Sequence, residues 1–316
     1  MKTWKRLLAL LLCAVLLSTC AFAGEIDPNK TCELTVRCKH EVEDVTYAIW
    51  RVAEVDENVR FRYVSPFRSK GFHNPNDYDE WEEIAETLVG YVEQKEIEPL
   101  ATDDTNSRGR AIFEKLRTGL YLVVGEPYTY NGTTYEQDPF LIALPTRSDN
   151  TQPWEYDVTT IRKSAQRVDN PQEKVDVSVL KIWSGDDDSL IRPASVTVYL
   201  LRDGAVYDSV TLHRRNNWSH AWKDLPTGHT WRVTEAEVPA EYTVLVHRNG
   251  SDFVIINTYT EPENSDEFID IPDDDVPLEK PEELPETGTL QWIVPLLLGA
   301  GALLFLMGLL RRRQEG

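Results

Sequence analysis

Three polar side chains occupy predicted strand faces that are otherwise apolar. Because side chains alternate between the two faces of a β-strand, residues two apart share a face. By this rule Lys181 lies on the same face as the three valines that precede it in its predicted strand. Glu235 shares a face with a Trp and a Val, and Asn257 with a Phe and an Ile. The sequence therefore predicts a lysine, a glutamate and an asparagine inside an apolar interior.

These three residue types can together form a covalent cross-link. Burial favours the neutral form of an ionisable group, so a buried Lys181 becomes a nucleophilic amine. A neutral Glu235 can exchange protons with its neighbours, and the Asn257 carboxamide becomes an electrophile when its oxygen is protonated or hydrogen-bonded. A Lys–Asn amide then forms with loss of ammonia, and a dry, fixed geometry supplies the rate. The alternative is that Lys181 and Glu235 reach solvent or form an ordinary ion pair.

The elements that must position these residues are predicted to be strands. The second half of the chain alternates short β-type runs with turns such as 202–204. Regularly spaced short strands indicate a β-sandwich. The predicted strands are 175–183, 195–201, 206–212, 229–235, 242–246 and 253–259.

The first half of the chain has the same texture and contains one helical insert, at about 76–95. Asn76 or Asp77 can cap this helix. We interpret its apolar stripe as core packing and not as a binding groove. The stripe consists of Trp81, Ile84, Ala85, Leu88 and Val92, and the predicted strands of this half are 32–38, 45–53, 120–125 and 140–144.

Several motifs follow one another in a recognisable order between residues 173 and 260. They are Val179-Leu180-Lys181-Ile182-Trp183, Arg192-Pro193-Ala194-Ser195-Val196-Thr197-Val198, Asn217-Trp218, Val233-Thr234-Glu235-Ala236-Glu237-Val238-Pro239 with Tyr242, and Ile256-Asn257-Thr258-Tyr259. Together they resemble the collagen-adhesin B-type (Cna B-type) repeat. The resemblance implies an immunoglobulin-like sandwich with an intramolecular Lys–Asn isopeptide bond. It also implies Lys181 as nucleophile, Asn257 as acceptor and Glu235 as proton shuttle. We expect the nearby Glu237 to face solvent.

The start of the chain has the features of a secretory signal. Residues 1–23 combine a basic beginning, an apolar stretch and a small-residue cleavage pattern. We expect cleavage between Ala23 and Gly24. A lipoprotein signal at Cys20 is the alternative, although Thr19 is a poor fit for the small residue that such a signal requires.

The other end of the chain carries Leu284-Pro285-Glu286-Thr287-Gly288, then the uncharged span 289–310, then three arginines. A span of this length crosses a bilayer as a helix, and the basic tail stays on the cytoplasmic side. This order resembles the LPxTG cell-wall sorting signal of Gram-positive surface proteins. The resemblance implies that a sortase cleaves between Thr287 and Gly288 and joins the threonine carbonyl to an amine of peptidoglycan or of another pilin subunit. An ordinary membrane anchor is the alternative.

The first half resembles the same family more loosely, as seen in Gram-positive pilin subunits. Residues 118–124 resemble the strand that leads to the family's Glu, but Gly125 stands at that position. Cys38 stands where the reactive Lys would be, and 158–161 contains no Asn. We therefore expect no isopeptide bond in this half.

Cys32 and Cys38 are the two cysteines that remain after export. Six residues of strand span about 20 Å, whereas a disulfide needs Cα atoms about 4.4–6.8 Å apart. We therefore expect buried thiols. A disulfide stays open as the alternative, because an oxidising exterior favours it.

Lys163 lies at the end of a segment that resembles a second motif. The segment Trp154-Glu155-Tyr156-Asp157-Val158-Thr159-Thr160-Ile161-Arg162-Lys163 resembles the pilin motif in which Trp, then Val four residues on, precede Tyr-Pro-Lys-Asn. Ile161, Arg162 and Ser164 replace the expected Tyr, Pro and Asn. In pilins that Lys receives the next subunit's Thr carbonyl, so Lys163 is a candidate acceptor. A plain interdomain lysine is the alternative.

Composition excludes several classes of function. The 316 residues include 53 Asp and Glu against 33 Lys and Arg, a formal charge of −20, which argues against nucleic acid as a partner. Without the two ends, 27 basic and 52 acidic residues remain in 24–287, and such a charge keeps an exposed protein soluble. The six His lack metal-ligand spacing, so we expect no metal and no cofactor. We interpret Asp186-Asp187-Asp188 as a solvated acidic loop in preference to a calcium site.

The predicted fold is mainly β, with two immunoglobulin-like (Cna B-type) β-sandwich domains in tandem. The predicted order is a signal peptide (1–23), a pilin-like β domain with the helical insert (24–168), a Cna B-type domain (169–261), an acidic Pro-containing stalk (262–283) and the sorting signal (284–316).

The predicted function is that of a Gram-positive cell-wall-anchored surface protein, a pilus subunit or pilin-related protein. Its expected partners are sortase and peptidoglycan or another pilin subunit, with contact to the membrane only before sorting. Its chemistry would be internal, so it is not expected to be an enzyme. The alternatives are a monomeric adhesin that binds a host or surface ligand and a wall-attached enzyme.

Overall fold

The computed structural model describes residues 25–68, 70–148, 152–161, 164–167, 173–186 and 192–260. These residues all fall within one compact unit of the chain. The predicted signal peptide, the stalk, the sorting signal with its membrane span, and Lys163 lie outside the described residues. Within the described residues no helix is long and apolar enough to span a membrane.

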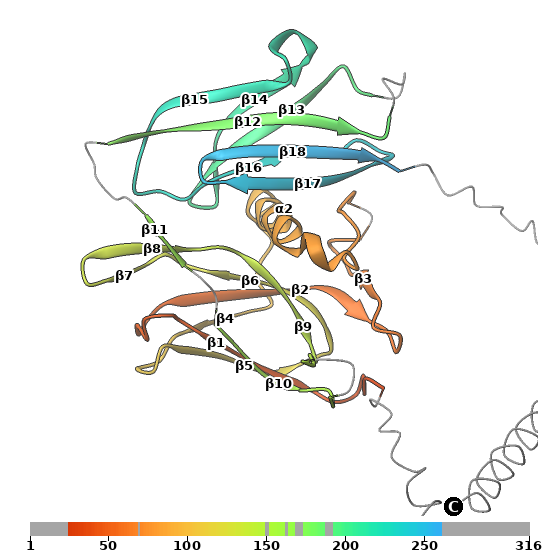
Figure 1. Cartoon of the computed structure of the whole chain (residues 1–316), viewed down its shortest axis with the longest axis vertical. Coiled ribbons are helices and arrows are strands. Elements are labelled where there is room, and N and C mark those ends of the chain that lie inside the picture. The colour runs from red at the N-terminus through yellow and green to blue at the C-terminus, as the bar shows by residue number, and fades with distance from the viewer. Residues whose placement is uncertain are drawn as a thin grey trace, which may run out of the picture. The chain divides into compact units, whose positions relative to one another are not determined.

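The second half of the described chain consists of two sheets (Figure 1). One sheet has the strand order β15-β12-β18-β17 and the other has the order β14-β13-β16. The first strand, β12, pairs in parallel with the last strand, β18. The bounds are β12 Lys174–Ser184, β13 Ser195–Arg202, β14 Ala205–His213, β15 Ser219–Pro226, β16 Trp231–Glu235, β17 Tyr242–Asn249 and β18 Asp252–Tyr259.

The first half is also built from strands, which confirms the expectation of a mainly β protein. Its sheets have the orders β10-β1-β5, β3-β2-β6-β9 with β4 on β2, and β11-β8-β7. As in the second half, its first strand pairs in parallel with a late strand, β1 with β10. The bounds are β1 Cys32–Arg37, β2 Thr46–Val55, β3 Phe61–Tyr63, β4 Ala101–Asp104, β5 Arg110–Leu116, β6 Gly119–Gly125, β7 Tyr128–Tyr130, β8 Thr133–Gln137, β9 Phe140–Leu144, β10 Asp157–Ile161 and β11 Ser164–Arg167.

The helical insert consists of a 3₁₀ turn, η1 (Tyr78–Glu80), followed by the α-helix α2 (Trp81–Gln94). The expected side-chain cap is wrong, because neither Asn76 nor Asp77 caps the helix. Asn76 instead bonds the backbone of Phe61, with its Oδ1 accepting from the amide at 2.7 Å and its Nδ2 donating to the carbonyl at 3.0 Å. Asp77 instead contacts a histidine.

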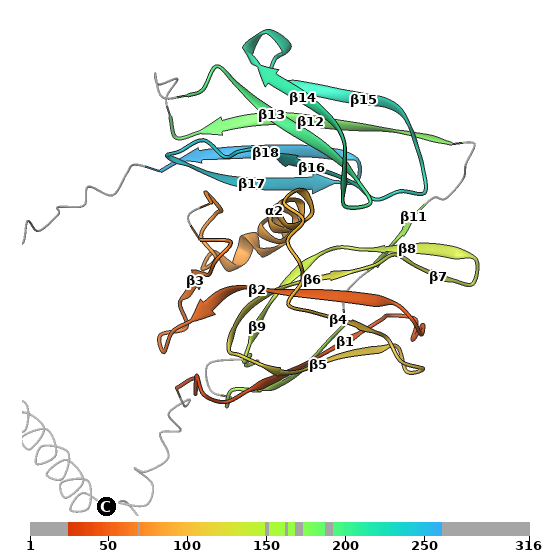
Figure 2. The same ribbon diagram turned by 180° about the vertical axis from the view of Figure 1, so that it is seen from behind.

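The apolar stripe of α2 belongs to the core, as expected. Ile84, Ala85, Leu88 and Val92 are buried in one hydrophobic cluster that also contains residues of β2 and β6 and of the second-half strands. The helix contacts β16 and β17 on one side and β6 and β9 on the other (Figures 1 and 2). Since β16 and β17 end their respective sheets, α2 covers the edge at which the two sheets of the second half meet.

Polar contacts hold α2 against these edge strands. Arg232 of β16 is buried and donates from Nη1 to both carboxylate oxygens of Glu86, at 2.9 and 2.8 Å. Glu93 lies 3.4 Å from Arg232 Nε. The Thr87 hydroxyl accepts the backbone N–H of Val246 at 2.8 Å. The helix thus satisfies backbone and charged groups that an uncovered edge would present to water.

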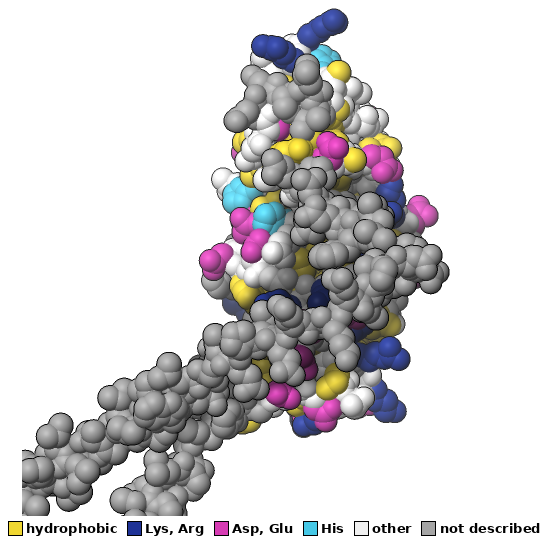
Figure 3. All heavy atoms as spheres, turned by 90° about the vertical axis from the view of Figure 1, so that its right-hand side faces the viewer, with side chains coloured by type: hydrophobic (Ala, Val, Ile, Leu, Met, Phe, Trp, Pro, Cys, Tyr) yellow, Lys and Arg dark blue, Asp and Glu magenta, His cyan; other side chains and the backbone are white. Residues whose placement is uncertain are grey.

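The visible surface of the described residues is mixed in charge. On the face drawn in Figure 3, Lys and Arg side chains are interspersed with Asp and Glu. Among the side chains coloured there, hydrophobic atoms form small separate groups.

Loss of the buried ion pair should cost far more than loss of an exposed pair at the same interface. Glu86→Ala should lower the free energy of unfolding by about 3 kcal/mol, because it leaves the buried Arg232 with only the weaker interactions of Glu93 and Glu136 among the described residues. Lys95→Ala breaks the exposed Lys95–Glu237 pair and should cost less than about 1 kcal/mol. Denaturant titration followed by tryptophan fluorescence measures both. Similar small losses would contradict this account of the interface.

Candidate functional site

The three predicted polar residues are buried together in the second-half sandwich. Lys181 of β12 is 3% exposed, Glu235 at the end of β16 is 5% exposed, and Asn257 of β18 is fully buried. Burial alternates along β12 and β18, so the apolar residues two positions away face the same interior. Glu237, two residues beyond the end of β16, is exposed, as expected.

Glu235 lies between the other two groups. Its Oε1 accepts a hydrogen bond from Asn257 Nδ2 at 3.2 Å, and its Oε2 lies 4.0 Å from Lys181 Nζ. The amine itself donates to two backbone carbonyls, Ile182 at 3.1 Å and Ile255 at 3.5 Å. One carboxyl oxygen therefore faces the amine and the other faces the carboxamide, the arrangement that proton exchange between them needs.

Two buried oxygen atoms of this site have no hydrogen-bond partner among the described residues, Glu235 Oε2 and Asn257 Oδ1. Unpaired buried polar atoms are rare in folded proteins and concentrate where chemistry occurs. The orientation of an Asn amide is assigned from its hydrogen bonds. Rotated by 180°, the Asn257 amide would place Oδ1 against Glu235, where a protonated carboxyl donates to it and makes the carbonyl carbon more electrophilic.

Burial moves both ionisable groups toward their neutral forms. Desolvation lowers the pKa of Lys181 to about 7, although the charge of Glu235 opposes this shift. Desolvation also raises the pKa of Glu235 to about 7, against the opposing effects of Lys181 and of the Asn257 hydrogen bond. A neutral amine and a protonated carboxyl are therefore accessible near neutral pH. They form a coupled pair whose titration belongs to both groups.

Aromatic rings cover the amine. The Lys181 Nζ atom lies 4.3 Å from the centre of the Trp183 ring. The ring of Trp183 in turn meets Trp218 and Tyr242 edge-on, with centroid separations of 5.3 and 5.0 Å. These rings keep water away from the nitrogen, which preserves the low dielectric on which its pKa depends.

A buried ion pair next to the site was not predicted from the sequence. Asp186 is 5% exposed, so its interpretation as part of a solvated loop is wrong. Its carboxylate accepts a bidentate interaction from Arg192 and the hydroxyl hydrogen of Tyr242 at 2.9 Å. The Arg192 hydrogen bond is the main reason why the pKa of Asp186 lies below its usual value. Asp187 and Asp188 lie outside the described residues.

Among its described residues, the first half has no comparable trio at the positions where its strands would place one. Gly125 stands at the position expected for Glu, and a Cβ there would lie 2.5 Å from Gln137 Nε2 and 2.6 Å from the Tyr47 ring. The Tyr47 hydroxyl donates to Gln137, whose Nε2 donates to the Glu126 carbonyl at 2.8 Å. A neutral hydrogen-bonded cluster therefore fills this position.

Both cysteines of the first half are buried free thiols, as expected. Cys32 lies at the start of β1, and burial raises its pKa to about 11. Cys38 lies just after the strand. A thiol with a raised pKa is a poor nucleophile at neutral pH.

The near-pilin motif is described in part. Val158 lies in β10, is buried and pairs with Leu34 of β1. Trp154 lies under the Arg147 guanidinium, 4.3 Å from the ring centre. Lys163 itself lies outside the described residues.

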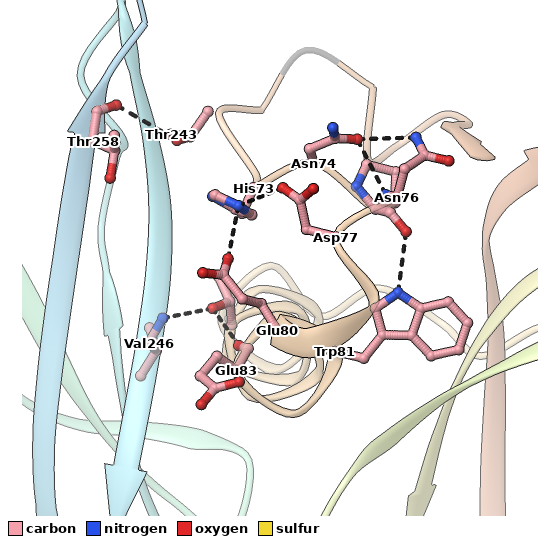
Figure 4. Close-up of polar contacts among 12 residues, drawn as sticks. His73, Asn74, Asn76, Asp77, Glu80, Trp81, Glu83, Thr243, Val246 and Thr258 are labelled. Atoms are coloured by element: carbon pink, nitrogen blue, oxygen red, sulfur yellow. Dashed lines mark hydrogen bonds and ion pairs between the residues drawn. The ribbon is translucent and has the colours of Figure 1, made fainter. Parts of the chain in front are cut away.

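A small cluster of possible metal ligands next to η1 was also not predicted from the sequence. His73 Nε2 lies 2.8 Å from Asp77 and 2.7 Å from Glu80 (Figure 4). Together these three residues could supply ligand atoms to a metal ion. However, one imidazole nitrogen serves both carboxylates, and all three side chains are partly exposed. The His73–Asp77 hydrogen bond and the His73–Glu80 ion pair at the start of the helix account for this arrangement.

Burial of Lys181 should appear as a pH dependence of stability in a Glu235→Gln variant. The folded pKa of Lys181 lies near 7, below its ordinary value of 10.5, so between these values the unfolded chain binds more protons than the folded protein. The free energy of unfolding therefore rises with pH across this window, with a slope approaching about 1.4 kcal/mol per unit. Denaturant titrations from pH 7 to 9.5 measure it. The Lys181→Met/Glu235→Gln double variant should lack the rise, and identical profiles for the two proteins would refute the burial effect.

Comparison with protein families gives a match in the second half of the chain. Residues 177–258 match the model of the family described as "Cna protein B-type domain". A comparison with curated proteins found no match.

Solved structures with detectable similarity include a single B repeat unit of the collagen-binding surface protein of Staphylococcus aureus. It is 17% identical, with 72% of this chain and 96% of that chain covered and a TM-score of 0.27. The full-length major pilin SpaD from Corynebacterium diphtheriae is 16% identical, with 74% and 65% covered and a TM-score of 0.29. The minor pilin of Streptococcus agalactiae is 14% identical, with 80% and 100% covered and a TM-score of 0.23. The sequence identities and TM-scores of these structures are too low to support a function for this chain. The family match covers residues 177–258, which contain Lys181, Glu235 and Asn257.

Proposed function

We propose that this chain is a surface protein of a Gram-positive cell wall whose Cna B-type domain closes a Lys181–Asn257 isopeptide bond. The observation that carries the proposal is the buried contact chain from Lys181 through Glu235 to Asn257. The match of residues 177–258 to the Cna B-type domain supports it.

The chemistry balances without a cofactor. The neutral Lys181 amine attacks the Asn257 carboxamide carbon, and a new C–N bond forms. The bond to the original amide nitrogen breaks, and that nitrogen leaves as ammonia. Glu235 takes a proton from the attacking amine through one oxygen and delivers a proton to the leaving nitrogen through the other. Because the groups are held together inside the fold, the reaction is intramolecular and the protein acts only on itself.

The bond would join the first and last strands of the domain. Lys181 pairs with Ile255, and Asn257 with Trp183, in the parallel β12–β18 ladder. A covalent link at this point ties the strand through which the chain enters the domain to the strand through which it leaves. Pulling force along the chain would then pass through the link and would not load the intervening strands.

Attachment at the cell surface is the second part of the proposal. A sortase would use the Leu284–Gly288 motif, cleave after Thr287 and join it to peptidoglycan or to another subunit. The proposed role is that of a pilus subunit or pilin-related protein, with Lys163 as the candidate acceptor. A monomeric adhesin that binds a host or surface ligand is the alternative role.

The first test is the intact mass of the mature protein. The wild type should be lighter than its sequence mass by one ammonia. Glu235→Ala should restore the full mass because no group remains to move the protons, and Lys181→Ala and Asn257→Ala should do so because a reactant is missing. Glu237→Ala is the matched control, an exposed glutamate two residues away that should leave the mass loss unchanged. A wild-type mass equal to the sequence mass would contradict the proposed bond.

The second test addresses assembly. Wall extracts of the native host, released with a wall-degrading enzyme and boiled in detergent, should give a ladder of covalent high-mass species on an immunoblot. Lys163→Ala should collapse the ladder to a single band, because it removes the acceptor amine. A ladder that survives this change would discard Lys163 as acceptor. A single band in the wild type would favour the adhesin alternative over the pilus subunit.

A further inference from the structure

The cluster of Asp186, Arg192 and Tyr242 lies beside the candidate bond and is not used by the chemistry described above. Asp186 follows β12, and Tyr242 begins β17. The Tyr242 hydroxyl donates to the Asp186 carboxylate at 2.9 Å, and Arg192 Nε donates to the same carboxylate at 2.7 Å. A buried carboxylate therefore connects the ends of two strands that belong to the same sheet.

This cluster is in contact with the cover over Lys181. The Arg192 guanidinium carbon lies 5.6 Å from the centre of the Trp183 ring, and the Tyr242 ring meets Trp183 edge-on at 5.0 Å. On the Lys181 side, the amine nitrogen is 4.3 Å from the same ring centre. The position of Trp183 over the amine thus depends on residues that Asp186 holds.

The cluster also sets the charge near the amine. Three charged groups act on Lys181: Glu235 from β16, and Asp186 and Arg192 from the cluster. Arg192 disfavours a second positive charge and lowers the Lys181 pKa, whereas Asp186 raises it. Asp186 pairs directly with Arg192. Its negative charge therefore partly cancels the effect of the Arg192 positive charge on the Lys181 pKa.

We propose that Asp186 is a positioning residue for the Lys181–Asn257 reaction, holding Arg192 and Tyr242 against Trp183 so that the amine stays covered and its charge balance is fixed. The inference rests on the proposed function, since it concerns the rate of the same bond. It assigns Asp186, Arg192 and Tyr242 no contact with the reacting atoms.

The test is the pH profile of bond formation during refolding. The mature chain is collected in denaturant before the bond forms, diluted into buffers of different pH, quenched in acid and analysed by intact mass over time. The wild-type rate should rise as Lys181 becomes neutral and fall as Glu235 loses its proton. Asp186→Asn should move the acidic limb to lower pH by about one unit, because it removes the charge that favours the ammonium. Arg192→Gln should move the same limb to higher pH by about one unit, because it removes the opposing positive charge.

Two further variants separate positioning from general stability. Tyr242→Phe keeps the ring against Trp183 but removes the hydrogen bond, so the bond should form roughly threefold to tenfold more slowly with an unshifted profile. Asp176→Asn is the matched control, because Asp176 pairs with Lys223 on the exposed part of β12 and should leave rate and profile unchanged.

The outcomes distinguish failure of the proposed Asp186 role from failure of the proposed Lys181–Asn257 bond. Profiles of Asp186→Asn and Arg192→Gln that superimpose on the wild type, or shift in the same direction, would overturn the inference and leave the bond itself intact. Tryptophan fluorescence shows whether Asp186→Asn refolds. If it does not, the inference is tested by Arg192→Gln and Tyr242→Phe, and it is overturned if the first does not shift the acidic limb to higher pH and the second does not slow the reaction. Absence of ammonia loss in the wild type would defeat the proposed function, and with it this inference.

Discussion

The cost of placing an amine and a carboxyl group inside an apolar sandwich is the constraint on which the rest of this structure depends. Burial favours neutral forms of Lys181 and Glu235, and it leaves oxygen atoms of Glu235 and Asn257 without partners among the described residues. The proposed amide would remove the share of this cost that belongs to the amine, because the linked side chain is neutral and the surplus nitrogen leaves as ammonia. The same burial would then both promote the reaction and favour its product.

The fold supplies this environment with elements far apart in the chain. The parallel pairing of β12 with β18 brings the amine next to the carboxamide strand, and β16 adds the carboxyl from the other sheet. The helix α2, from the first half, covers the edge at which the two sheets meet, and Glu86 fixes it to β16 through Arg232. The first half thus contributes to the closed interior around Glu235, whereas its own strands enclose the neutral Tyr47–Gln137 pair at the corresponding position.

Local patterns predicted much of the second half, because strand parity is a local property. Alternation along β12, β16 and β18 was sufficient to select Lys181, Glu235 and Asn257. It did not reveal β15, whose sequence contains Lys, Asp and Pro and whose strand depends on pairing with β12. Asn76 failed as a cap because the Phe61 backbone binds its amide, and Asp186 is buried because of Tyr242, 56 residues away. Such long-range competition leaves no trace in sequence spacing.

The most direct test of the central claim is a tryptic digest of the mature wild-type protein with fragmentation of the largest peptides. The account predicts a branched peptide in which the side chains of Lys181 and Asn257 are joined, with no cleavage after Lys181 because an acylated lysine is not a trypsin site. Two separate linear peptides, with Lys181 cleaved normally and Asn257 an intact carboxamide, would contradict it.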